Sequence, residues 1–84
     1  MSRIVDKLRQ AFTRFGVRRV RVYEDEEEKG YFHAEFDAIR PSDRQAISEA
    51  IAKKLGLQVE GGGTLLATKT RKALSDVSFS LKRR

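Results

Sequence analysis

The sequence contains no cysteine, one proline and a single histidine, His33. Without cysteine, neither a disulfide framework nor a thiolate metal site is available. No long apolar run is present, so no membrane-spanning helix is expected, and the first residues lack the apolar stretch of a secretory signal. We therefore expect one soluble domain, residues 1–84, located in the cytoplasm.

Acidic residues are scarce outside one short segment. The chain has 18 basic and 12 acidic residues, for a net charge of +6. Five of the acids form one run, Glu24, Asp25, Glu26, Glu27 and Glu28. A remainder this basic should attract polyanions at moderate salt. The alternative is that the charge only keeps a small protein in solution.

The first half of the chain predicts a helix followed by a hairpin. Apolar residues three and four apart predict one buried helix face. They are Ile4, Val5, Leu8, Ala11, Phe12 and Phe15. Ser2 is a plausible N-cap, and Gly16 can end the helix in a left-handed conformation. Alternation in Arg19–Tyr23 and in Tyr31–Asp37 then predicts two antiparallel strands.

The second half repeats this plan. Ser42 and Gln45 fit a capping box, Gly56 ends the helix, and the predicted buried stripe is Ala46, Ile47, Ala50, Ile51 and Leu55. Leu57–Glu60 predicts a short strand, and the glycines at 61–63 predict a break, as a bulge or a flexible turn. Leu65–Lys69 predicts a strand whose inward face is ambiguous, and Val77–Leu81 predicts the last strand.

These elements give an α+β fold of two αββ units, residues 1–40 and 41–84. We expect a four-stranded, antiparallel-dominated sheet with both helices on one face. Phe32–Phe36 and Val77–Leu81 are the most apolar strands and should be central. One such arrangement is a circularly permuted ferredoxin-like sandwich. The alternative is a split sheet that hairpins from two subunits complete in a dimer.

The exposed sheet face is the first candidate site. Its outward residues should be Arg19, Arg21, Tyr23, Tyr31 and His33, joined by Ser78, Ser80 and Lys82. Rings and cations on a sheet are typical of surfaces that bind single-stranded nucleic acid. Two alternatives remain: the tyrosines form a cross-strand pair that stabilises the hairpin, or another subunit covers the face.

Two further charged features are candidates. A basic stripe on the first helix, continued by Arg18, and a basic C-terminal tail could contact phosphates or could simply be solvated. Their residues are Arg3, Lys7, Arg14, Arg18, Lys82, Arg83 and Arg84. The acidic run Glu24–Glu28 predicts a mobile, solvated hairpin tip; its functional alternative is a contact with a basic partner protein.

No enzyme site is predicted. His33, Glu35 and Asp37 share one strand face, but a second histidine and a nucleophile are lacking, so neither catalysis, a metal nor a cofactor is expected. We expect a non-enzymatic module that binds nucleic acid, DNA or RNA, single-stranded rather than duplex. The alternative is a protein–protein interaction module, an inhibitor or adaptor of a larger complex of viral or plasmid origin. A homodimer fits both.

Overall fold

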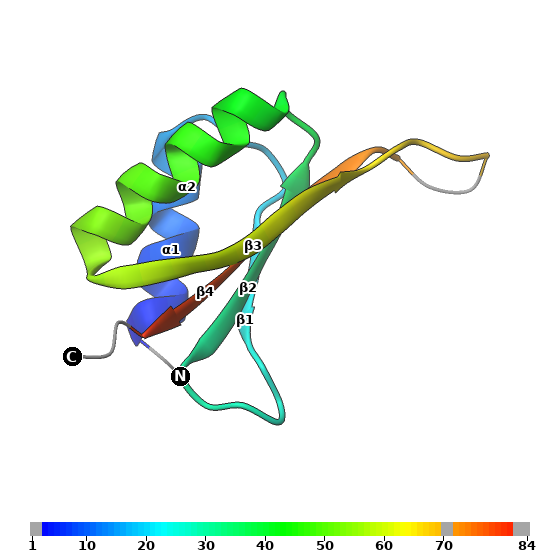
Figure 1. The fold of residues 1–84 in the computed structure, drawn as a ribbon. Helices are drawn as coiled ribbons and strands as arrows, with labels where there is room; N and C mark the ends of the chain where they lie inside the picture. The colour runs from blue at the N-terminus through cyan, green and yellow to red at the C-terminus, as the bar shows by residue number, and fades with distance from the viewer. Residues whose placement is uncertain (1–2, 70–71, 82–84) are drawn as a thin grey trace.

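The computed structural model describes residues 3–69 and 72–81, and this part of the chain forms two helices and four strands (Figure 1). Their order is α1 (Arg3–Arg14), β1 (Arg21–Glu24), β2 (Tyr31–Asp37), α2 (Pro41–Leu55), β3 (Leu57–Leu65) and β4 (Leu74–Leu81). The predicted α-β-β-α-β-β arrangement is confirmed. The predicted cap Ser2 and the tail residues Lys82, Arg83 and Arg84 lie outside the described residues.

The sheet has the strand order β1-β2-β4-β3, with every pair antiparallel. The two most apolar strands, β2 and β4, are therefore central, as predicted. Both helices lie on the same side of the sheet (Figure 1). The opposite face of the described residues is left open. The description as a permuted ferredoxin-like sandwich stays a prediction.

The core forms where α1 meets the central strands. Leu8 and Phe12 of α1 are fully buried, and the Phe12 ring lies 5.0 Å from that of Phe36 and 6.0 Å from that of Phe79. Gly16 follows the helix with a φ of 86°, which is the left-handed ending that the sequence predicts. Phe15 lies beyond the end of α1 and is 51% exposed, so it does not complete the predicted stripe.

The start and the buried face of α2 differ from prediction. The N-cap is Arg40, without a side-chain capping bond, and Pro41 opens the helix, so the Ser42–Gln45 capping box is wrong. Proline replaces the box because its fixed φ and missing N–H suit the first helical position. The predicted helix end at Gly56 is confirmed, with a φ of 70°.

The buried stripe of α2 is rotated from the predicted one. Ala46 and Ala50 are exposed, whereas Ser48 and Ala52 are buried beside Ile51. Ser48 tolerates burial because its hydroxyl donates to the carbonyl oxygen of Arg44, 2.6 Å away. A serine whose hydroxyl is hydrogen-bonded to its own helix backbone can thus occupy a core position, although its residue type does not predict burial.

β3 passes through the three glycines without a break. Its register shifts between Val59 and Gly61, which makes Glu60 the extra residue of a β-bulge, and pairing with β4 then continues to Leu65. The break predicted at the three glycines is therefore wrong, since they pair in register with β4 and the bulge lies just before them. The predicted strand at Leu65–Lys69 is wrong beyond Leu65, since residues 66–69 lie in the connection to β4. This hairpin extends away from the rest of the molecule (Figure 1).

Candidate functional site

A groove between the two helices gathers basic side chains. The spacing of Lys7 and Arg14 along α1 places them on one flank of the helix, and Lys54 reaches the same place from the last turn of α2. The groove has a volume of about 330 Å³, and its lining is Lys7, Gln10, Ala11, Arg14, Lys54 and Leu55. None of the described lining residues carries a carboxylate. Lys7, Arg14 and Lys54 form no ion pair within the described residues.

The other basic residue of the helix stripe, Arg3, is exposed at the start of α1, and Arg18 is exposed in the connection to β1. The sequence prediction missed Lys54, because that residue is separated from the α1 stripe by half of the chain. Its only local signal is a pair of lysines in the last turn of α2, which also suits the helix dipole. Only the packing of the helices brings Lys54 to Lys7 and Arg14.

The predicted sheet-face residues Arg21, Tyr23, Tyr31 and His33 do lie on the open face. Arg21 and Tyr23 pair with positions of β2 on this face, and the burial of β2 alternates so that Phe32, Ala34 and Phe36 point to the helices. The two tyrosines are not cross-strand partners, since Tyr23 is opposite His33 and Tyr31 opposite Ser80. Instead, both rings lie 5.1 Å from the His33 ring, which makes a row of three rings.

Carboxylates lie close to the arginines of this face. Arg21 lies 4.0 Å from Glu35, and Arg19, which has a left-handed φ of 56° before β1, lies 3.9 Å from Asp37. The Tyr23 hydroxyl donates to Glu35 over 3.3 Å. Partial burial, followed by the Glu35 charge, raises the pKa of Tyr23 above its ordinary value of 10.0.

The open face is therefore acidic rather than basic. Asp76 of β4 joins Glu35 and Asp37 by the strand register, and Glu60 of β3 accepts a hydrogen bond from the Ser80 hydroxyl. The sequence carried a signal for this, since acids alternate with core residues in β2 and β4. The net charge of the whole chain does not reveal the acidic face, because the acids of one strand face are distributed along the sequence.

His33 ties the acidic loop to the sheet. Its Nε2 lies 2.9 Å from Asp25 Oδ1, and its Nδ1 lies 3.1 Å from the Ser78 hydroxyl. Asp25 also accepts from the backbone N–H groups of Glu27 and Glu28, at 3.1 and 2.9 Å. The hydrogen bond with His33, followed by that with the Glu28 backbone, holds the pKa of Asp25 below 3.8. The start of the predicted mobile loop is thus anchored.

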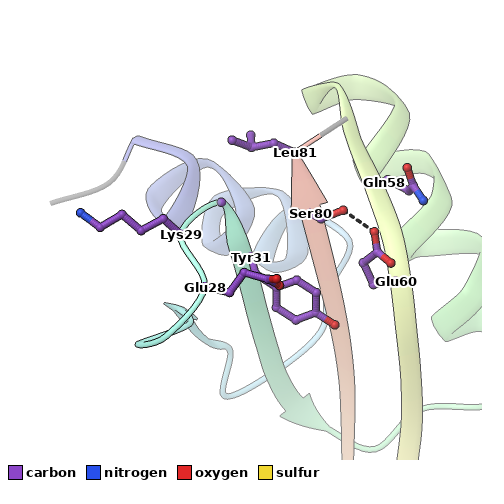
Figure 2. A pocket seen from close by; sticks show the side chains of 8 residues that line it. Glu28, Lys29, Tyr31, Gln58, Glu60, Ser80 and Leu81 are labelled. Carbon is purple, nitrogen blue, oxygen red and sulfur yellow. Dashed lines mark hydrogen bonds between the residues drawn. The ribbon is translucent and has the colours of Figure 1, made fainter. Parts of the chain in front are cut away.

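A second hollow lies at the end of the open face where β2 begins and β4 ends (Figure 2). Its volume is about 540 Å³. The polar and aromatic lining residues are Glu28, Lys29, Tyr31, Gln58, Glu60 and Ser80, so a ring, an amide, a hydroxyl, one ammonium group and two carboxylates surround it. It offers acceptors and one π-face, which suits a cation better than a phosphate.

The β3–β4 connection contributes exposed residues that sequence reasoning did not select. Lys69 and Lys72 are exposed there, as are Leu65 and Leu66, and Leu66 is 82% exposed. The adjacent leucines leave the inward face of the predicted strand ambiguous. The structure buries neither of them, because this part of the hairpin extends beyond the helices (Figure 1).

The described residues hold no group of three or more histidine, cysteine or acidic side chains arranged to bind a metal ion. None of the helices in the described ranges is long and apolar enough to cross a membrane. No protein-family model, curated protein or solved structure matches this chain.

Proposed function

We propose that the protein is a non-enzymatic nucleic-acid-binding module that contacts backbone phosphates through its helix layer. The observation that carries the proposal is the groove where Lys7, Arg14 and Lys54 converge without a carboxylate in the lining. Ammonium and guanidinium groups without intramolecular ion pairs can neutralise phosphates without first breaking such pairs.

The distribution of charge between the layers supports the helices over the sheet. Among the described residues, the two helices contain seven basic and three acidic residues, whereas the four strands contain one basic and five acidic residues. A phosphate backbone approaching the open face would meet Glu35, Asp37 and Asp76, and it would compete with carboxylates for Arg19 and Arg21. At the groove, none of the described lining residues is a carboxylate that would compete with a phosphate for the basic side chains.

This mode of binding positions a nucleic acid without reading its sequence, because phosphates are the same at every nucleotide. Three phosphate contacts correspond to a slope of log K against log salt of about −2 for a single strand. The affinity should then fall roughly 20-fold between about 50 and 200 mM salt. We expect single strands to bind at least as well as duplexes, with little dependence on base composition.

The test is fluorescence anisotropy with mixed-sequence single-stranded and duplex oligonucleotides over a range of salt concentrations. The groove variant replaces Lys7, Arg14 and Lys54 with glutamine. The control variant replaces Arg9, Lys29 and Arg40 with glutamine, which gives the same net charge away from the groove. We expect the groove variant to lose most of its affinity and nearly all of its salt slope, since on a single strand each lost phosphate contact lowers the magnitude of the slope by about 0.7.

The control variant should retain most of its affinity and its salt slope. Equal losses in the two variants would show that net charge, and not the groove, attracts the nucleic acid. The absence of binding by the unmodified protein at about 50 mM salt would refute the proposal altogether.

A further inference from the structure

The geometry points to a second binding surface on the opposite side of the molecule: the hollow at the end of the open sheet face docks an arginine-bearing segment of a basic protein partner. In this arrangement the arginine side chain lies over the Tyr31 ring, and its guanidinium pairs with Glu60. The inference does not depend on the nucleic-acid proposal, because it uses other residues on another face.

The chain contains an internal example of this recognition. The guanidinium of Arg21 lies 5.3 Å from the centre of the Tyr23 ring and 4.0 Å from a carboxylate oxygen of Glu35. A tyrosine on one strand and a carboxylate on the next strand thus hold one guanidinium, by cation–π and ionic attraction together.

A tyrosine and a carboxylate also line the hollow, on β2 and β3 with the strand β4 between them, and no guanidinium of the described residues lines it. Tyr31 and Glu60 both line it, with Ser80 of β4 between them and Gln58 on the same strand as Glu60 (Figure 2). One carboxylate oxygen of Glu60 accepts from the Ser80 hydroxyl, and the other has no hydrogen-bond or ion-pair partner within residues 3–69 and 72–81. The hollow therefore offers a π-face and an available carboxylate oxygen to an incoming cation.

Lys29 does not fill this place. It lines the edge of the hollow, but its side chain extends away from Tyr31 and Glu60 (Figure 2). It makes no ion pair with a described residue. Within residues 3–69 and 72–81, no neighbouring cation thus uses the acceptors of the hollow.

Charge complementarity identifies the occupant as a basic protein segment. Glu35, Asp37, Glu60 and Asp76 lie on the open face, and the exposed acids Glu26, Glu27 and Glu28 follow the anchored Asp25 at its end. This field attracts cationic segments and repels nucleic acid. Arginine fits better than lysine, because a planar guanidinium stacks on a ring and bonds a carboxylate in the same plane.

The test uses NMR chemical-shift titration of the full chain at about 50 mM salt. The probes are an arginine-containing basic peptide, the same peptide with lysine, the same peptide with neutral citrulline, and a single-stranded oligonucleotide of equal length. We expect the arginine peptide to shift Tyr31, Gln58 and Ser80. The lysine peptide should bind several-fold more weakly, and neither the citrulline peptide nor the oligonucleotide should shift these residues.

Two variants assign the contact. Glu60→Gln and Tyr31→Leu should each weaken the arginine peptide tenfold or more, whereas Glu49→Gln, which removes an exposed acid from α2, should change its affinity less than twofold. Glu60→Gln is an exposed substitution, so it remains informative if Tyr31→Leu fails to fold. Four results would each overturn the inference: Glu60→Gln and Glu49→Gln have equal effects, or the lysine peptide binds as well as the arginine peptide. The others are that the arginine peptide does not bind, or that the oligonucleotide shifts the residues of the hollow.

Discussion

Phe12 and Phe15 belong to the same apolar stripe in the sequence but should contribute very differently to stability. Phe12 is fully buried between the rings of Phe36 and Phe79, whereas Phe15 is 51% exposed beyond the end of α1. Truncating a buried phenylalanine to alanine costs about 3–5 kcal/mol, from lost apolar burial and from the cavity that remains. The same change at the half-exposed Phe15 should cost about 1 kcal/mol or less.

These magnitudes matter because a domain of this length has little stability to lose. At 84 residues the free energy of unfolding should be about 4–13 kcal/mol. Phe12→Ala therefore removes a large fraction of it, and a protein at the lower end of this range would be mostly unfolded. Phe12→Leu, which keeps most of the volume, should cost roughly 1–2 kcal/mol and leave a folded protein to measure.

The assay is urea unfolding followed by far-ultraviolet circular dichroism, with the slope of free energy against denaturant compared among variants. We expect Phe15→Ala to lower the urea midpoint least, Phe12→Leu to lower it more and Phe12→Ala to lower it most, with little change of slope. A Phe15→Ala variant as destabilised as Phe12→Ala would refute the packing described for the end of α1. A Phe12→Ala variant that loses less than about 1.5 kcal/mol would refute its place at the centre of the core.

Two further predictions concern β3 and the acidic loop. A Cβ at Gly62 would lie 2.9 Å from the backbone oxygen of Asp76, whereas one at Gly61 meets nothing within 4 Å. Gly62→Ala should therefore lower the free energy of unfolding in urea by about 1–3 kcal/mol, and Gly61→Ala should lower it much less. Equal costs would contradict the bulge register. The lowered pKa of Asp25 stabilises the fold above the ordinary value of 3.8, and this stability is lost as the pH falls through the lower folded pKa. Asp25→Asn should thus lose less stability than the unmodified protein between about pH 5 and pH 3, and equal losses would show that the contact with His33 contributes nothing there.

Local sequence determines most of the fold because the signals for helices and turns are short-range. The glycines that end α1 and α2 and the alternation in β2 and β4 each depend on residues close in the chain. The path of β3 through Gly61 and Gly62 does not, since its register is fixed by pairing with β4 across a bulge. The buried face of α2 also depends on where the sheet lies, and so Ser48 is buried while Ala50 is exposed.

The candidate surfaces depended even more on tertiary structure. The alternation correctly placed Arg21, Tyr23, Tyr31 and His33 on the open face, and in Leu57–Glu60 it puts Glu60 on one face with Gln58. It could not show which strand would pair with β3 and so which side chains would surround Glu60. Likewise, the α1 stripe was visible in the sequence, but the groove that it forms with Lys54 was not. Periodicity assigns a residue to a face, whereas the charge of a face is the sum over strands or helices that are distant in the chain.

The net charge of +6 therefore describes this molecule poorly. The helices are predominantly basic and the strands predominantly acidic. Because the two layers face opposite directions, the molecule has an electric dipole that runs from the sheet to the helices. A polyanion attracts the helix layer and repels the sheet layer. It should therefore orient the protein with its helices toward the phosphates before contact. In that orientation the open sheet face, with Tyr31 and Glu60, points away from the nucleic acid. A basic protein segment could then occupy the hollow while the groove is filled, because neither ligand blocks the other.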